Sequence, residues 1–597
     1  MLINTKLSLL SVAIAVLQQT VFAQTALPRI NINTDDGKAI VSKEEWRTIT
    51  FSLNDPSNPQ NNIAAIGNQQ IRGRGNSSWN AMWNSITPAL PDGTRYRNPY
   101  RIRFRKEQQQ SPFGLPAARN WVLMNADPDK NAFGLEMGKR LDLLYTCSYN
   151  PVEVYINNGN SGKYILTEHR QADPAYIGAP GRPKVHLTEG WFVELDRDTT
   201  DDGESIKFRT KTYRLPAIIK SPEFTNNVND PSYDFVKRDL NKIADLMASN
   251  DFPENGYRDL VDAESFIKYF LVQTFIQNID LFRKGTETGD HIGSVFIYKD
   301  KGGKIGAGPL WDLNWSFLSG SQGQTVGNMG PNLFPYMVHP WLARFFDDPE
   351  FLVRYMEIWN EKMPEIESMR NFIDEIVRKF KTGTDLTSSI NSMTSFYNSR
   401  LTYLKTEYNK VNVRPTVKNF GTRGYNYGQA SPRAVTLVSY GEMSNLSATL
   451  QKGASSDFEI TSNLNQTPTG KGGYLAAINV KPKDSLATAS YRDTLVLNGS
   501  KQGNAFTFKV PLSFVVSSEA EEQPTSILPQ IASDNKVILI KNPTAKVRIY
   551  NTGGKEVANY TITGYVNNIS LNHLPHGIYI VKISRGNEHK IMRIAVR

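Results

Sequence analysis

The string IRGRGNSSW, residues 71–79, combines the residue types that bind anions. Glycines alternate with Arg72 and Arg74 in it. Glycine lets a backbone approach an anion closely, and arginine binds phosphate through two nitrogens. The same pattern is also typical of an ordinary surface loop, so the string alone leaves both interpretations open.

A second basic string, NPYRIRFRK at residues 98–106, alternates apolar residues with Arg101, Arg103 and Arg105. A period of two predicts a strand over Tyr100–Arg105 with one apolar face and one cationic face. That cationic face is either a solvated surface or a row of guanidinium groups that faces phosphate.

Two further strings carry side-chain oxygens among apolar residues. Asn278 and Asp280 stand near the end of the apolar stretch 262–284, and Asp312 and Asn314 alternate with aromatic residues in GPLWDLNWSF, residues 308–317. A strand or tight turn would direct both oxygens of the second string to one side, where they suit a hard cation such as Mg²⁺. The plainer interpretation is an Asx turn with a capping aspartate.

Other kinds of chemistry have little support. Glu194 and Asp196 could be the paired carboxylates of a glycoside hydrolase. Their spacing on a strand, however, fits neither the retaining nor the inverting carboxylate separation closely. No GxSxG element occurs, and seven histidines without metal-ligand spacing argue against a histidine-rich metal site. The single cysteine, Cys147, excludes an internal disulfide, and its apolar surroundings predict a buried thiol.

These residues need a large framework to position them, and 597 residues are enough for two to four domains. Residues 28–410 are predicted to form one α+β unit, with early strands and then helices. Asp262–Lys284 is expected to be a central helix capped by Asp262, and Pro349–Lys381 a helical region broken near Pro364.

The composition changes after residue 414. Short alternating runs between turn clusters predict an immunoglobulin-like β-sandwich over residues 414–516. Residues 517–526 (SSEAEEQPTS) are charged and poor in apolar residues, which is typical of a linker. Residues 527–597 again alternate, with a hairpin signal at Thr552–Lys555, and predict a small C-terminal β-sandwich.

The two ends of the chain indicate export. Lys6, an apolar run over residues 7–17 and Val21-Phe22-Ala23 predict a signal peptide over residues 1–23, with a buried N-terminal helix as the alternative. No later stretch is expected to cross a membrane. The net charge of +10 does not predict nucleic-acid binding, because residues 536–597 hold ten Lys or Arg against two Glu and leave only +2 elsewhere.

Taken in order, the strings of residues 28–410 resemble the CotH (spore coat protein H) family. The resemblance rests on IRGRGNSSW, NPYRIRFRK, NWVLMNADPD (120–129), VEVYINNGNSGKYILTE (152–168), WFVELD (191–196), the N-x-D end of the apolar stretch and GPLWDLNWSF. It implies an atypical protein-kinase-like fold that binds ATP with Mg²⁺ or Mn²⁺ and phosphorylates Ser or Thr of surface or secreted proteins. The alternative is a non-catalytic surface protein whose kinase-like domain holds a protein or glycan partner.

The resemblance also implies roles for particular residues. Asp280 would be the catalytic aspartate that orients the acceptor hydroxyl, and Asp312 with Asn314 would bind the metal. The residues that would bind nucleotide or phosphate are Arg72, Arg74, Arg103 and Glu168. Asn314 stands where the family often has aspartate, and fewer carboxylates weaken metal binding.

The last segment resembles the C-terminal sorting domain of type IX (Por) secretion. The similar features are VRIYNTGGKEV, the LPHGIYIVKI block and a basic final strand. The resemblance implies contact with the type IX secretion machinery, removal of the tag, and a secreted or outer-membrane surface-attached protein.

Overall fold

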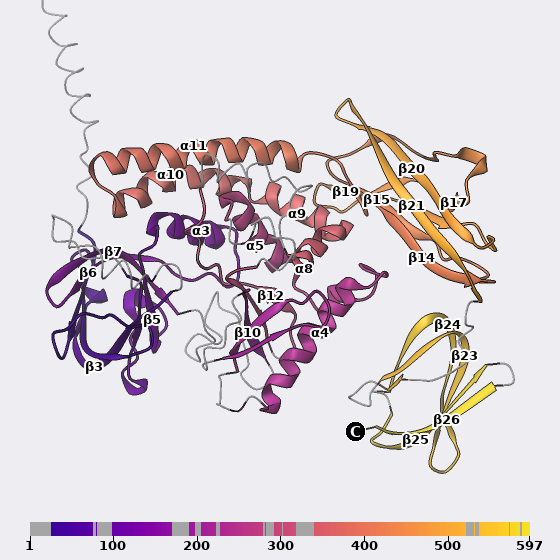
Figure 1. The fold of residues 1–597 in the computed structure, drawn as a ribbon, viewed down its shortest axis with the longest axis horizontal. Helices are drawn as coiled ribbons and strands as arrows, with labels where there is room; N and C mark the ends of the chain where they lie inside the picture. Colours follow the sequence, from indigo (N-terminus) through magenta and orange to yellow (C-terminus); the bar gives the residue numbers. More distant parts are fainter. Residues whose placement is uncertain are drawn as a thin grey trace, which may run out of the picture.

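The computed structural model describes most of the chain (Figure 1). The described residues are 26–75, 79, 98–169, 190–197, 205–222, 227, 229–278, 281, 292–300, 302–317, 339–520, 530–531, 537–571, 574–585 and 588–596. The predicted signal peptide, residues 1–23, and Asp280 lie outside them. Within the described residues, no helix is both long and apolar enough to cross a membrane.

The first part is a closed barrel of seven strands, which the sequence did not predict. Its order is β1-β2-β3-β4-β5-β7-β6, and all pairs are antiparallel except β1 with β6. The strands are β1 (Arg29–Thr34), β2 (Arg47–Asn54), β3 (Ile63–Gly73), β4 (Tyr100–Arg103), β5 (Asn120–Met124), β6 (Asn150–Ile156) and β7 (Gly159–Glu168). Alternate side chains fill the barrel interior, among them Ile71, Ile102 and Trp121.

The second part combines a five-stranded sheet with helices. The sheet order is β12-β11-β8-β10-β9, from β8 (Trp191–Leu195), β9 (Ile206–Arg209), β10 (Pro216–Ser221), β11 (Val295–Lys299) and β12 (Ile305–Ala307). The helices are α3 (Pro128–Arg140), α4 (Asp234–Ala248), α5 (Ala263–Ile276), α8 (Pro340–Ala343), α9 (Pro349–Glu361), α10 (Met363–Phe380) and α11 (Gly383–Tyr408). A single large core joins them, and it includes Cys147, which is buried as predicted.

Helix α5 is the central helix that the sequence predicts, but it is shorter than expected. The side chain of Asp262 caps it by accepting a hydrogen bond from the Ser265 amide. The helix ends at Ile276, where Gln277 adopts the left-handed conformation. The predicted break near Pro364 is confirmed, since α9 ends at Glu361 and Pro364 occupies the first turn of α10.

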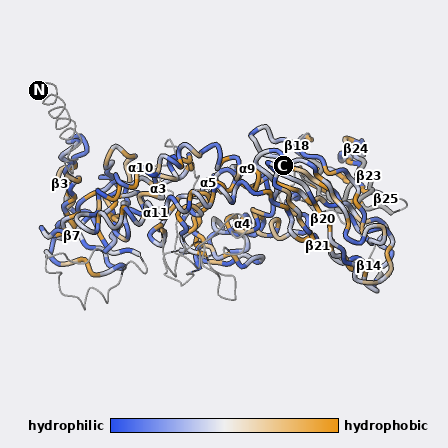
Figure 2. The backbone as a smooth tube through the Cα atoms, turned by 90° about the horizontal axis from the view of Figure 1, so that it is seen from above, coloured by the Kyte–Doolittle hydropathy of each residue, from blue (hydrophilic) through white to orange (hydrophobic). Residues whose placement is uncertain are grey.

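The third part contains two sheets around one core. One sheet has the order β13-β15-β19-β17, with β18 also paired to β19, and the other has the order β14-β21-β20-β16. The strands are β13 (Asn412–Arg414), β14 (Lys418–Tyr425), β15 (Arg433–Tyr440), β16 (Ser444–Leu450), β17 (Phe458–Ile460), β18 (Asn465–Pro468), β19 (Gly473–Pro482), β20 (Ala489–Lys501) and β21 (Asn504–Ala520). Buried and partly exposed residues alternate along β20. Figure 2 shows hydrophilic and hydrophobic residues mixed along the strands of this part. The immunoglobulin-like assignment stays a prediction, and Ser517–Ala520 of the predicted linker lies in β21.

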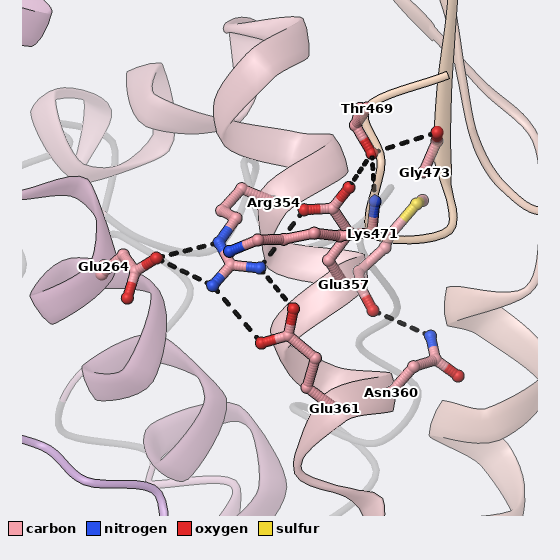
Figure 3. A network of polar contacts seen from close by, with 9 residues as sticks. Glu264, Arg354, Glu357, Asn360, Glu361, Thr469, Lys471 and Gly473 are labelled. Carbon is pink, nitrogen blue, oxygen red and sulfur yellow. Dashed lines mark hydrogen bonds and ion pairs between the residues drawn. The ribbon is translucent and has the colours of Figure 1, made fainter.

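The third part packs directly on the helical part through α9. Arg354 of α9 binds Glu264 of α5 at 2.8 Å and Glu361 at 2.7 Å, and it also contacts the buried Glu357 at 3.3 Å (Figure 3). The other carboxylate oxygen of Glu357 accepts a hydrogen bond from the hydroxyl of Thr469, which precedes β19. The network therefore joins α5, α9 and the turn between β18 and β19.

Further contacts show that this junction is a packed interface. Val438 of β15 belongs to the core of the helical part. The buried guanidinium of Arg414 donates to the Phe346 carbonyl at 2.6 Å, and Arg433 donates to the Asn250 carbonyl at 3.1 Å. Gly473 lies so close to α9 that a Cβ there would be 2.5 Å from the Glu357 carboxylate.

The last part is a small β unit built from β22 (Gln530–Ile531), β23 (Val537–Asn551), β24 (Glu556–Ser570), β25 (Gly577–Arg585) and β26 (Glu588–Val596). Its sheet has the order β22-β23-β25-β26, and β24 pairs with β23. The predicted hairpin turn is confirmed between β23 and β24, where Gly554 has a φ of 80° and its amide donates to the Asn551 carbonyl.

Candidate functional site

The strand β4 has the two faces that its alternation predicts. Tyr100 and Ile102 are buried in the barrel, whereas Arg101 and Arg103 extend from its outer surface. Both guanidinium groups lie over the ring of Trp46, with centroid distances of 5.6 Å for Arg101 and 4.0 Å for Arg103. Arg72, from the neighbouring strand β3, lies 4.7 Å from the same ring.

Two residues that the sequence did not single out hold this arginine cluster together. Arg72 pairs with Arg101 in the β3–β4 register, a position where like charges repel. The negative face of the Trp46 ring offsets that repulsion. The side-chain oxygen of Asn120 accepts hydrogen bonds from Arg101 at 3.0 Å and from Arg103 at 3.5 Å. The cluster is defined here as Arg72, Arg101 and Arg103 around Trp46.

Arg74 lies over a different aromatic ring from Arg72. Its guanidinium lies 5.3 Å from the centre of the Trp311 ring, in the segment that carries Asp312. The preceding glycine, Gly73, is required by close packing, because a Cβ there would lie 2.5 Å from the ring of the buried Trp79. The end of β3 therefore contacts the segment of residues 308–317.

That segment is irregular, so it is not a strand, which was one of the two conformations that the sequence left open. Asp312 has a φ of 57°, a left-handed conformation that aspartate tolerates better than most residues. The N-terminal turn of α3 holds the segment in place. The side-chain oxygen of Asn131 accepts a hydrogen bond from the Leu313 amide at 2.9 Å, and the Lys130 ammonium donates to the Asn314 carbonyl at 3.5 Å.

The end of helix α5 also contacts this segment. Asn278, two residues past the end of the helix, donates from its side chain to the Asp312 carbonyl at 3.5 Å. The structure thus brings Arg74, Asp312 and the end of α5 to one place, at the boundary between the barrel and the helical part. Asp280, for which a catalytic role is predicted, lies outside the described residues.

Two buried side-chain oxygens near this place have no hydrogen-bond donor. They are Oδ1 of Asn314, one of the predicted metal ligands, and Oδ1 of Asp129 on the first turn of α3. Burial raises the pKa of Asp129, and the charge of Asp127 adds to that rise. Over the described part of the chain, no group of three or more His, Cys, Asp or Glu side chains has a metal-binding arrangement.

Glu168, the other residue predicted to contact nucleotide, has structural partners. Its buried carboxylate accepts hydrogen bonds from the Ser148 amide at 2.6 Å and from the Ser148 hydroxyl. It anchors the chain before β6 to the end of β7. The two carboxylates considered for hydrolysis also have partners, since Glu194 pairs with Lys220 at 2.8 Å and Asp196 accepts from the Ser294 amide at 3.0 Å.

Comparison with known families identifies two regions. Residues 71–411 match the family model described as CotH kinase protein, and residues 526–597 match that of the secretion system C-terminal sorting domain. The first match covers more than half of the chain and contains the end of β3, together with β4, α3, α5 and the segment of Asp312. The second covers the small β unit at the C-terminus and implies export to the cell surface or beyond by the type IX secretion machinery.

Similarities to solved structures are slight. The CupB2 chaperone of Pseudomonas aeruginosa is 15% identical, with a TM-score of 0.13, over 31% of this chain and 100% of its own. The DraB chaperone of E. coli is 12% identical, with a TM-score of 0.14, over 32% of this chain and 96% of its own. At these TM-scores, neither similarity supports a conclusion about the fold or function of this chain. No curated protein matches the chain.

Proposed function

This chain belongs to the CotH kinase protein family, and we propose that it transfers the γ-phosphoryl group of ATP to Ser or Thr hydroxyls of surface or secreted proteins, with Mg²⁺ or Mn²⁺ as cofactor. The observation that carries the proposal is the contact between Arg74 and Trp311. Phosphoryl transfer requires cationic groups and metal ligands around one set of phosphate oxygens. The contact joins the basic edge of the barrel to the segment of Asp312 and Asn314.

The arginines supply the cationic groups in this proposal. Arg72, Arg74 and Arg103 neutralise phosphate oxygens and orient them by paired hydrogen bonds. Trp46 restrains Arg72 and Arg103 by stacking, so less side-chain entropy is lost when phosphate binds.

The side chains of Asp312 and Asn314 fit a hard cation. Such cations take carboxylate and amide oxygens as ligands, and Oδ1 of Asn314 is a buried oxygen without a hydrogen-bond donor. A bound Mg²⁺ or Mn²⁺ would neutralise charge on the transferred phosphoryl group. Lys130 and Asn131 fix the backbone of this segment, so they act as positioning residues.

Asp280 is the proposed catalytic residue that orients the acceptor hydroxyl. Support comes from its neighbour Asn278, whose hydrogen bond to Asp312 brings the end of α5 to the proposed metal ligands. Glu168 is the residue proposed to contact the nucleotide, and its carboxylate accepts a hydrogen bond from the Ser148 amide.

The test is incorporation of labelled phosphate from ATP by the full chain without residues 1–23, with Mg²⁺ or Mn²⁺ and a generic protein acceptor. Wild type should label the acceptor, and Asp312→Ala should not. Asp484→Ala, an exposed aspartate of the third part, is the matched control and should behave as wild type. No labelling by wild type, or equal labelling by Asp312→Ala, rejects the proposal.

The alternative is a non-catalytic protein that holds a surface partner. Nucleotide binding distinguishes the two functions, because a ligand at a hundredfold excess over its Kd stabilises the fold by about 2.7 kcal/mol. A melting temperature that rises when ATP and metal are added supports the kinase proposal. An unchanged melting temperature favours the binding protein.

A further inference from the structure

Two arginines from separate elements lie where the segment after α4 meets the third part of the fold. Arg344, which follows α8, donates to the Met247 carbonyl at 2.9 Å and to the Asp347 carboxylate at 2.7 Å. Arg433 of β15 donates to the Asn250 carbonyl at 3.1 Å. Both side chains are partly buried. Their hydrogen bonds therefore fix two positive charges at this junction.

The third cation at the junction is Lys418, the first residue of β14. Its partly buried ammonium makes no hydrogen bond and no ion pair with any residue that the structure describes. Other partly buried lysines bind a carboxylate directly, as Lys299 does with Asp239 at 2.6 Å and Lys362 does with Asp142 at 2.5 Å. Because a buried charge without a partner is costly, the packing of the junction does not explain this lysine.

The surroundings of Lys418 favour its neutral amine. Burial is the main cause that lowers its pKa to about 8, and repulsion by Arg433 and Arg344 adds to that effect. Asp251 and Glu254 act in the opposite direction, but their side chains are 74% and 76% exposed, so solvent screens their charges. At pH 8 about half of the Lys418 side chains therefore carry a nucleophilic amine, whereas an ordinary lysine is almost entirely protonated.

We propose that Lys418 is a site of carbamylation by carbon dioxide. The amine nitrogen attacks the carbon atom of CO₂, an N–C bond forms, and the electron pair of one C=O π bond moves to oxygen. The nitrogen releases one proton to water, so the product is a carbamate with one negative charge. The step needs no oxidant and no reductant. This modification goes beyond the proposed kinase activity and is independent of it.

The two arginines suit the carbamate better than they suit the unmodified lysine. A carbamate presents two oxygens in the same planar arrangement as a carboxylate, and guanidinium groups bind that arrangement through paired N–H donors. The modification replaces an ammonium that Arg344 and Arg433 repel by an anion that they attract. It should therefore strengthen the packing of the third part on the helical part.

Lys501 shows why burial alone is not sufficient for this chemistry. Burial lowers its pKa to about 8 as well. Its ammonium, however, donates to the Asn409 carbonyl and to the Asn409 side-chain oxygen, the latter at 2.8 Å. Burial is the one cause of this shift, so none of the described arginines is placed to bind a carbamate at Lys501. Lys501 is thus a matched control within the same chain.

The test is incubation of the full chain without residues 1–23 at pH 8 with ¹³C-labelled bicarbonate, which supplies CO₂. Carbamates are trapped by ethylation with triethyloxonium and located by peptide mass spectrometry. Lys418 should be modified at least tenfold more than Lys501 and the exposed Lys509. Arg433→Gln should lower the modification of Lys418 several-fold. Arg492→Gln, which removes an exposed arginine of the third part, is the control and should have no effect.

Stability provides a second measurement. A group that forms only in the folded state stabilises that state, so bicarbonate should raise the urea midpoint of wild type above its value in an equal concentration of chloride. Lys418→Met should show no such rise.

Any of three results would overturn the proposal. One is the absence of a trapped carbamate at Lys418, and another is equal modification of Lys418 and Lys509. The third is a urea midpoint that rises as much with sulfate as with bicarbonate, which would make the junction a non-covalent anion site. The comparison of Lys418 with the two control lysines needs only the wild-type chain, so it tests the proposal even where Arg433→Gln fails to fold.

Discussion

The guanidinium of Arg74 lies 5.3 Å from the centre of the Trp311 ring, so the glycine-rich string after β3 contacts the segment that carries Asp312. The two residues are far apart in the sequence and belong to different parts of the fold. Cation–π contacts are individually weak, but this one links the basic edge of the barrel to the proposed metal ligands. The contact is therefore the first one to test.

A double-mutant cycle measures this contact. The single changes Arg74→Ala and Trp311→Leu and their combination should show a coupling energy of about 0.5–1 kcal/mol in urea unfolding. The matched cycle with Arg72→Ala should show none, because Arg72 lies over Trp46. Equal coupling in both cycles would mean that the effect is not specific to the contact.

Metal affinity should respond to the ligand at position 314. Asn314→Asp adds a carboxylate beside Asp312, so the proposed site should bind Mn²⁺ several-fold more tightly. The measurement is the shift of the melting temperature during a Mn²⁺ titration. Asn398→Asp adds the same charge on the exposed surface of α11 and serves as the control. The same Mn²⁺ response in both variants would contradict a metal site at Asn314.

Asp129 should destabilise the fold at neutral pH. Its pKa is raised by burial, so the folded state holds the proton to a higher pH than the unfolded state does. Stability then falls as pH rises through that pKa. Asp129→Asn should raise the free energy of unfolding at pH 7 by about 1 kcal/mol, a gain that disappears on acidification below pH 4. Asp35→Asn alters an exposed carboxylate that is not among the charges acting on Asp129 and should bring no gain. A less stable Asp129→Asn variant would argue against this account.

Lys418 should cause the free energy of unfolding to increase as the pH becomes mildly alkaline. Burial, with Arg433 and Arg344 nearby, lowers the pKa of Lys418 to about 8. Between pH 8 and the unfolded pKa near 10.4, the unfolded state binds more protons, so the free energy of unfolding rises with pH. Urea unfolding at pH 7.5 and 9.5 should show about 1 kcal/mol of this rise in wild type and its loss in Lys418→Met. The exposed Lys509→Met is the control, and an unchanged rise in Lys418→Met would refute the assignment.

The interface between the helical part and the third part should be sensitive to a single methyl group. A Cβ at Gly473 would lie 2.5 Å from the Glu357 carboxylate, so Gly473→Ala should destabilise the chain by about 1–3 kcal/mol. Gly577→Ala is the control, because the nearest atom to its Cβ would be 3.7 Å away. Calorimetry should show the two parts unfolding in one transition. Separate transitions in wild type would show that the packing around Val438 and Arg414 does not couple them.

Local patterns in the sequence determined several elements correctly. The period of two in residues 100–104 gives β4 its buried and basic faces, Asp262 caps α5, and Gly553-Gly554 form the hairpin turn. These features depend on residues close together in the chain, which is why the sequence shows them. The ordered strings of residues 71–411 and the pattern of residues 526–597 likewise identified the two families.

Only the tertiary structure decided which distant residues meet. Closure of the barrel, the stacking of Arg103 on Trp46 and the contact of Arg74 with Trp311 join residues that no local period relates. The same holds for Lys418 with Arg344 and Arg433, which the fold brings together from three separate elements. Packing selects among many contacts of similar local energy, and that selection is made by the whole chain.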